Sequence, residues 1–207
     1  MLVKMIKKII LIGGLVIATL IIGAFTLISK DDEVTVQGLK VGDDAPEFFG
    51  IDQAGNQLNL SKVIENGPVV LIFYRGYWCP YCNKHLSQLQ DSLQLILDKG
   101  ASVIAISPEL PEFAEKTISK TGASFSIISD TTYQIMKDYK VDYTVGKGKA
   151  FMYKVFGMNI EKTNGDDSNT LPVPATYIID INGKIKYVHF KSDYKKRASI
   201  SEILKNL

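Results

Sequence analysis

Cysteine and histidine are scarce in this sequence, with two of each among 207 residues. Two cysteines cannot build a disulfide-stapled scaffold or a zinc site of four thiolates, although they suffice for one redox pair. A charge excess is also missing, because 24 basic and 22 acidic residues leave a formal net charge of +2. Nucleic-acid-binding proteins normally carry a strong basic excess, so we expect no nucleic-acid partner. The charged fraction of 22% is that of a globular protein and excludes wholesale disorder.

Charge is absent altogether from residues 9–29, of which the first 20, Ile9 to Ile28, are almost all apolar. A helix of that length spans roughly 30 Å, the thickness of the hydrocarbon core of a bilayer. Because lysines lie within residues 1–8, this end is expected in the cytoplasm and the rest of the chain on the extracytoplasmic side, periplasmic or extracellular. We therefore predict a transmembrane helix over residues 9–29, with the lipid bilayer as a partner.

A cleaved signal peptide is the alternative interpretation of this segment. Its apolar region usually measures about 7–15 residues and ends in a small-x-small cleavage site. The run here is longer, and it ends in Thr26 to Lys30 without such a site. The length therefore favours an uncleaved anchor.

The remaining chain is interpreted as a polar linker, residues 30–40, and one α/β domain, residues 41–207. The run Val69 to Tyr74 is apolar and β-branched, which is typical of a strand buried on both faces of a sheet. Strands and helices then alternate, and Asn182 followed by Gly183 predicts a tight hairpin near the end. This order predicts a mixed central sheet with helices on both faces. Residues 144–170 are rich in Gly, Lys and Asn and carry no clear pattern. Apolar residues at spacings of three and four predict one helix that Gly100 ends: Leu86, Leu89, Leu93, Ile96 and Leu97.

The two cysteines, Cys79 and Cys82, lie in the tetrapeptide CPYC between the predicted strand and this helix. A thiolate at a helix amino terminus is stabilised by unpaired N–H groups and by the helix dipole. The first cysteine is then expected to have a depressed pKa and to act as the nucleophile, with Cys82 as the resolving thiol. Pro80 suits the first helical position, where its missing N–H costs nothing. Two buried structural cysteines are the alternative.

Several neighbouring residues are expected to shape this site. Trp78 either shields the thiol or packs in the core, and Tyr81 lies between the cysteines. Arg75 either lowers the thiol pKa or binds a developing oxyanion, and the alternative is a surface ion pair. Pro174 precedes a predicted strand and forms either a cis peptide bond or an ordinary rigid turn. His85, one helical turn beyond Cys82, is either a metal ligand with the two thiols or, as we expect, a solvated surface residue.

The segment Phe73 to Cys82, FYRGYWCPYC, resembles the active-site segment of peroxiredoxin-like proteins of the alkyl hydroperoxide reductase/thiol-specific antioxidant (AhpC/TSA) family. That family belongs to the thioredoxin-fold superfamily. The resemblance covers roughly Leu39 to Leu204 and implies a thioredoxin-like fold, a redox-active Cys79 and a cis bond at Pro174. It extends through further segments: Val41 to Phe48, Val103 to Pro108, Asn164 to Ser168, Leu171 to Thr176, and Asp193, Tyr194 and Arg197.

The chain departs from the peroxiredoxin pattern at two positions. Peroxiredoxins usually carry a Thr three residues before the attacking cysteine, where this chain has Gly76, and an Arg before a later strand, where it has Pro174. The resemblance implies a cofactor-free hydroperoxide reductase regenerated by a thioredoxin-like dithiol donor. The departures favour the alternative, a thiol-disulfide oxidoreductase acting on exported protein disulfides. A metal carrier that uses Cys79, Cys82 and His85 is the third hypothesis.

Overall fold

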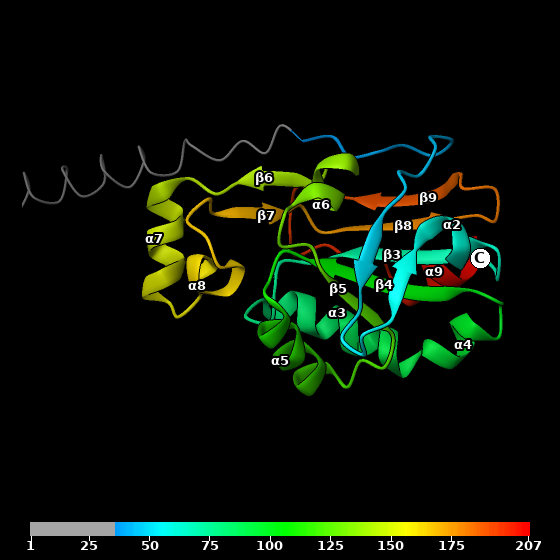
Figure 1. Cartoon of the computed structure of the whole chain (residues 1–207), viewed down its shortest axis with the longest axis horizontal. Coiled ribbons are helices and arrows are strands. Elements are labelled where there is room, and N and C mark those ends of the chain that lie inside the picture. Colours follow the sequence, from blue (N-terminus) through cyan, green and yellow to red (C-terminus); the bar gives the residue numbers. More distant parts are fainter. Residues whose placement is uncertain (1–35) are drawn as a thin grey trace, which may run out of the picture.

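A computed structural model describes residues 36–207 and shows a five-stranded mixed sheet with helices on both faces (Figure 1). The strand order is β5-β4-β3-β8-β9. β3 (Val69–Phe73) pairs in parallel with β4 (Ser102–Ser107), and β4 pairs in parallel with β5 (Ser126–Ser129). On its other side β3 pairs antiparallel with β8 (Ala175–Ile179), which pairs antiparallel with β9 (Ile185–Phe190). This arrangement confirms the predicted mixed sheet.

The alternation of side chains along β3 creates two apolar cores. Val70 and Ile72 face a core that includes buried residues of α3 (Pro80–Asp91), α4 (Leu93–Leu97), α5 (Pro111–Thr121) and α9 (Ile200–Asn206). The remaining side chains of β3 face the opposite core, which is covered by α2 (Leu60–Ile64), α6 (Gln134–Asp138) and the hairpin of β1 (Phe49–Ile51) and β2 (Gln57–Asn59). All five residues of β3 are buried, as its apolar run predicts.

Local details differ from the sequence prediction where single residues interrupt a pattern. The helix after Cys82 is divided at Ser92, whose backbone is not helical, and Leu97 is exposed rather than buried. α6 begins only after Tyr133, because this residue adopts a left-handed conformation with φ of 61°. Gly183 has φ of 76°, which fits the predicted hairpin turn between β8 and β9.

Residues 144–170, whose sequence carries no clear pattern, form helices and parts of two strands. β6 (Asp142–Thr144) and β7 (Thr170–Pro172) form an antiparallel pair, and α7 (Lys147–Val155) and α8 (Ile160–Asn164) lie between them at one end of the molecule (Figure 1). A small apolar cluster holds this excursion together: Val145, Ile160 and Leu171, with Trp78 and Tyr153 packed against them. The excursion therefore packs directly on the residue that precedes Cys79.

The expected cis bond at Pro174 is wrong, because no peptide bond within residues 36–207 is cis. The chain runs on from β7 into β8 past Pro174, and the N–H of Val173 donates to the carbonyl of Val141. An extended path of this kind accommodates the trans isomer, which X–Pro bonds prefer by about 0.5–1 kcal/mol.

The predicted transmembrane helix, residues 9–29, lies outside the described residues. Within residues 36–207, no helix combines the length and the apolar character needed to cross a bilayer. Leu39, in the predicted linker, is buried in the core, and the N–H of Gly38 donates to the carbonyl of Lys140.

Candidate active site

The two cysteines lie where the central strand passes into a helix, as the sequence predicts. β3 ends at Phe73, and α3 begins at Pro80 with Cys79 as its N-cap. The Cys79 sulfur accepts a hydrogen bond from the N–H of Cys82 at 3.4 Å, and Pro80 occupies the first turn. Unpaired N–H groups of the helix therefore point toward Cys79.

The two sulfurs are close enough to bond. Cys79 and Cys82 are free thiols, and their Sγ atoms lie 2.6 Å apart. Each residue is only 1% exposed. A disulfide can therefore form and reopen here with little movement of the backbone.

The electrostatics of the pair differ from the sequence expectation that the pKa of Cys79 is depressed. The hydrogen bond with Cys82 raises the pKa of Cys79, burial adds to this, and the nearby Arg75 charge only partly opposes it. Burial also raises the pKa of Cys82. The hydrogen bond with Cys79 and the positive charge of Arg197 outweigh that effect and lower the pKa of Cys82. Two adjacent sulfurs cannot both ionise easily, so in this arrangement the negative charge lies on Cys82.

Arg75 is buried beside the pair, so the surface ion pair considered from sequence is wrong. Its side chain is 2% exposed, and its guanidinium donates to the hydroxyl of Tyr153 at 2.8 Å. The guanidinium carbon lies 4.9 Å from the ring centroid of Trp78, 5.2 Å from that of Tyr153 and 4.6 Å from that of Tyr194. Its Nε has no hydrogen-bond partner within the described chain. The site therefore contains a buried guanidinium surrounded by three aromatic rings, and its Nε–H is available as a hydrogen-bond donor.

The remaining residues that the sequence analysis assigned to the site lie around Arg75 and the two cysteines. Trp78 is half-buried and packs against two apolar clusters, so it belongs to the core as well as to the site. Tyr81 is 40% exposed and meets Tyr194 edge to face at 5.7 Å. Because β3 and β8 pair Phe73 with Ala175, Pro174 lies beside the start of the site loop.

His85 is buried rather than solvated. It is 3% exposed, and burial, aided by the charge of Arg197, lowers its pKa to about 4. The backbone of Ala198, in the segment that covers the site, lies next to the His85 ring and partly opposes this lowering of its pKa. Within the described residues, no three His, Cys, Asp or Glu side chains are grouped to hold a metal ion. The metal-carrier hypothesis therefore lacks a third ligand here.

Glu109 is a site residue that the sequence analysis missed. It is fully buried and accepts hydrogen bonds from the Tyr74 hydroxyl at 2.7 Å, the Tyr77 N–H at 2.8 Å and the Thr117 hydroxyl at 2.8 Å. Burial raises its pKa. Two of these donors belong to the loop before Cys79, so Glu109 holds that loop in place. The available signal was an acidic residue just past the apolar run of Val103 to Ile106.

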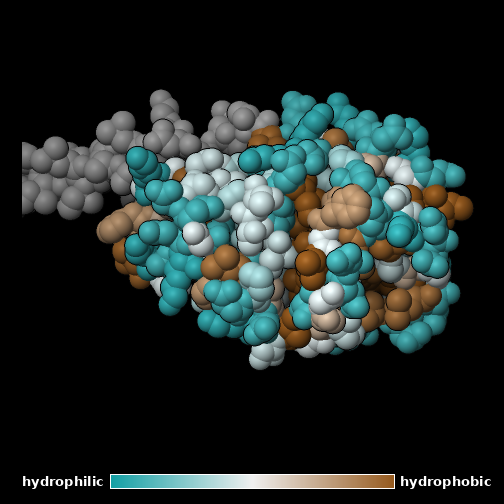
Figure 2. All heavy atoms as spheres, viewed as in Figure 1, coloured by the Kyte–Doolittle hydropathy of each residue, from teal (hydrophilic) through white to brown (hydrophobic). Residues whose placement is uncertain are grey.

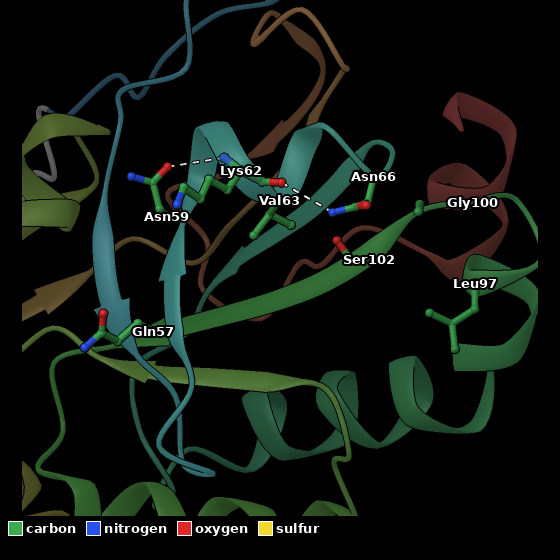
Figure 3. Close-up of a pocket in the computed structure, with 9 residues that line it drawn as sticks. Gln57, Asn59, Lys62, Val63, Asn66, Leu97, Gly100 and Ser102 are labelled. Carbon is green, nitrogen blue, oxygen red and sulfur yellow. Dashed lines mark hydrogen bonds between the residues drawn. The ribbon is translucent and has the colours of Figure 1, made fainter.

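The surface has a hollow of about 520 Å³ in another part of the domain, and Figure 3 shows the residues that line it. It is lined by residues of β2 and α2, including Asn59 and Lys62, and by the chain from Leu97 to Ser102. Ser102 begins β4, whereas Cys79 follows the opposite end of the parallel strand β3. The hollow is therefore separate from the redox site.

The domain matches a known family over most of its length. Residues 41–188 match the model of the AhpC/TSA family. The chain belongs to this family. Peroxiredoxin Bcp of Escherichia coli K12 is 29% identical over 150 residues, which are 72% of this chain and 85% of the relative. Peroxiredoxin Q from the chloroplast of Oryza sativa subsp. japonica is 28% identical over 166 residues, 80% of this chain. That match spans 65% of the rice protein, so this chain covers just under two thirds of its relative.

Solved structures support the fold assignment. Peroxidoxin BcpB from Mycobacterium tuberculosis superposes with a TM-score of 0.63 at 20% identity, covering 81% of this chain and 96% of that one. A peroxiredoxin-like protein from Aquifex aeolicus gives 0.61 at 19% identity, covering 82% and 86%. The domain thus has the thioredoxin-like fold of peroxiredoxins.

Proposed function

We propose that this protein is a thiol-dependent peroxidase that reduces hydroperoxides with the Cys79–Cys82 pair. The observation that carries the proposal is the 2.6 Å separation of two free sulfurs at the strand–helix junction of an AhpC/TSA domain. The relatives named peroxiredoxin support the same chemistry. The burial of both sulfurs favours a small oxidant over a folded protein substrate.

The reaction proceeds in two steps through the sulfur of Cys79. The Cys79 proton first passes to the Cys82 sulfur across the 2.6 Å contact. The Cys79 thiolate attacks one oxygen of the hydroperoxide, the O–O bond breaks, and the alkoxide that leaves takes up that proton to become the alcohol, which leaves Cys82 as the thiolate. Cys79 is now a sulfenic acid. The Cys82 thiolate attacks this sulfur, an S–S bond forms, the S–O bond breaks, and hydroxide leaves as water after protonation. Two thiols have then supplied two electrons to the peroxide, and a thioredoxin-like dithiol donor would restore them.

Arg75 would replace the threonine that peroxiredoxins usually carry. Gly76 occupies that position with φ of 142°, and a Cβ there would lie 2.9 Å from Trp78 Nε1 and 3.2 Å from Glu109 Oε2. The loop therefore has no room for a threonine side chain. The unpaired Nε of Arg75 offers a donor for a peroxide oxygen in its place.

A second candidate, thiol-disulfide exchange on exported proteins, is favoured by the same missing threonine. The deciding experiment mixes the reduced full chain, in detergent, with hydrogen peroxide, with an alkyl hydroperoxide or with a model protein disulfide, at equal concentrations. We expect peroxide to oxidise Cys79 at least a hundredfold faster than it oxidises a free thiol. A rate equal to that of a free thiol, with faster reaction of the disulfide, would replace the peroxidase by the exchanger. The Cys79→Ser variant is the control for both reactions.

We further propose that residues 9–29 anchor the domain to a membrane on its extracytoplasmic side. The long uncharged run and the preceding lysines support this placement. The C-terminal half of α7 supports it too. Four apolar side chains in this half and at the residue that caps it are 41–70% exposed next to lysines: Phe151, Met152, Val155 and Phe156. Figure 2 shows apolar surface at the end of the molecule where Figure 1 draws α7. The few residues between position 29 and the described chain could not carry the domain more than about 25 Å from a bilayer.

Fractionation of expressing cells tests the anchor. We expect the full-length chain in the membrane pellet after alkaline extraction, with its intact mass and with the domain sensitive to protease added from the extracytoplasmic side. A soluble product that begins after the apolar run would instead identify a cleaved signal peptide.

A further inference from the structure

Arg197 lies against the second sulfur of the pair. It belongs to the segment between β9 and α9, residues 191–199, and its Nη2 is 3.4 Å from the Sγ of Cys82. Its Nη1 donates to two carbonyl oxygens of its own segment, those of Tyr194 and Lys196. Among residues 36–207, Arg197 forms no ion pair with an acidic side chain. The Cys82 sulfur is therefore the group whose negative charge this guanidinium faces.

The segment that carries Arg197 is fixed over the site from several sides. The His85 ring of α3 lies next to the backbone of Ala198, and the His189 ring of β9 lies next to the backbone of Lys196. The ring of Tyr194 covers the Arg75 guanidinium at 4.6 Å. These contacts come from three different elements, so the position of Arg197 over Cys82 does not depend on its own side-chain contact alone.

Without the charge of Arg197, the thiol of Cys82 would lose its proton less readily. It is 1% exposed, and burial of a thiol disfavours its charged form. A guanidinium within hydrogen-bond distance of the sulfur supplies an opposite charge, and the nearby backbone of Arg75 also lowers the pKa of Cys82. Cys79, by contrast, has the charge of Arg75 nearby. The charge of Arg197 therefore favours the thiolate of Cys82, and the charge of Arg75 favours the thiolate of Cys79.

We propose that Arg197 is a positioning residue for the second half of the reaction, where it keeps Cys82 anionic and directed at Cys79. This inference rests on the proposed peroxidase function. When Cys79 becomes a sulfenic acid, the Cys82 thiolate attacks its sulfur, the S–S bond forms, and the S–O electron pair leaves with hydroxide. Arg197 neither gives nor takes a proton in this step. Its charge ensures that the attacking sulfur has already lost its proton.

The first test measures Cys82 alone, without any peroxide. In a Cys79→Ser background, the ultraviolet absorbance of the thiolate is followed against pH. The charged and titratable groups that face Cys82 are Arg197, Arg75, His85 and, farther out, His189, whose partner Glu202 lies on α9. We expect Arg197→Gln to raise the pKa of Cys82 by at least one unit, and Arg197→Lys to restore most of the difference.

A matched control removes the same charge one residue away. Lys196 is exposed, and the site uses only its backbone, so Lys196→Gln should leave the pKa of Cys82 within a few tenths of a unit. If Arg197→Gln shifts the pKa no more than Lys196→Gln does, Arg197 merely shapes its own loop and the proposal is wrong.

The second test follows the sulfenic acid in the chain with both cysteines. After a single addition of hydroperoxide, a dimedone-type trap reports how long Cys79 remains a sulfenic acid. We expect Arg197→Gln to lengthen this lifetime about tenfold at a pH below the original pKa of Cys82, and the difference to disappear at a pH above the raised pKa. A lifetime unchanged at every pH would overturn the proposal. If peroxide fails to oxidise Cys79 at all, the peroxidase function fails, whereas the first test still decides whether Arg197 controls Cys82.

Discussion

Replacing Arg75 by methionine separates the electrostatic role of this residue from its packing role. Methionine keeps an unbranched apolar side chain among the rings of Trp78, Tyr153 and Tyr194 while it removes the cation. Among the described residues Arg75 bonds to Tyr153 rather than to a carboxylate, so the change leaves no acidic partner stranded. The consequences for stability and for reactivity can therefore be predicted separately.

The expected change in stability is small. The substitution forfeits cation–π contacts of about 0.5–2 kcal/mol each and the hydrogen bond to Tyr153. It also removes a guanidinium that is 2% exposed and has an unpaired Nε, and the burial of such a charge costs several kcal/mol. Because these effects oppose each other, we expect the free energy of unfolding to change by no more than about 2 kcal/mol.

The expected change in reactivity is larger. The charge of Arg75 lowers the pKa of Cys79 against the other influences on it. An opposite charge within about 4–6 Å lowers a pKa by about 1–3 units, and one unit corresponds to about 1.4 kcal/mol. Loss of the cation should therefore reduce the thiolate fraction of Cys79 at least tenfold at a pH below its pKa.

Alkylation of Cys79 by iodoacetamide in a Cys82→Ser background measures this effect without the second sulfur. We expect Arg75→Met to move the pH profile of the alkylation rate to higher pH by at least one unit and Arg75→Lys to move it much less. Arg197→Gln in the same background is the control, since its charge is directed at Cys82. An Arg75→Met variant that stays folded and keeps the original profile would refute the reasoning that assigns Arg75 to Cys79.

Three further predictions concern the scaffold around the site. Leu86→Ala, at a fully buried position on α3, should lower the free energy of unfolding by about 2–5 kcal/mol in chemical denaturation. Ser199→Ala removes half of the capping box of α9, in which the Ser199 hydroxyl accepts from the Glu202 N–H at 3.2 Å. The melting temperature should fall by about 2–4 °C, for a loss of about 1 kcal/mol. The pKa of His85 is lowered to about 4 in the fold, so its contribution to stability is present above its ordinary value of 6.5 and is lost as pH falls toward 4. The His85→Gln variant should lose less stability than the original chain between pH 6.5 and 4 in parallel denaturant titrations.

Local signals predicted the parts of the fold that depend on neighbouring residues. The buried run from Val69 predicted β3, and the tight-turn pair Asn182 and Gly183 predicted the β8–β9 hairpin. The position of Cys79 at the start of α3 followed from the same strand and from Pro80. Each of these features is decided by fewer than about ten consecutive residues, which is the range over which periodicity and turn chemistry act.

The residues that surround the sulfurs could not be found in this way. Glu109, Tyr153 and Arg197 reach the site from three separate segments, and their contacts depend on how the sheet and the excursion of residues 142–172 pack. His85 has a polar side chain within an amphipathic helix, which predicts a surface position. It is buried because residues 191–199 cover it, and that contact joins residues more than a hundred positions apart.

The charges of the site match the chemistry proposed for it. Two sulfurs 2.6 Å apart accommodate one negative charge but resist a second, whereas Arg75 and Arg197 place two positive charges beside them. Glu109 bonds to Tyr74, Thr117 and the loop backbone rather than to either guanidinium, so the two arginines and the two sulfurs carry one surplus positive charge between them. Each step of the proposed reaction releases one anion, first an alkoxide and then hydroxide, before a proton neutralises it. A site with one surplus cation stabilises both leaving groups without having to move a charged residue.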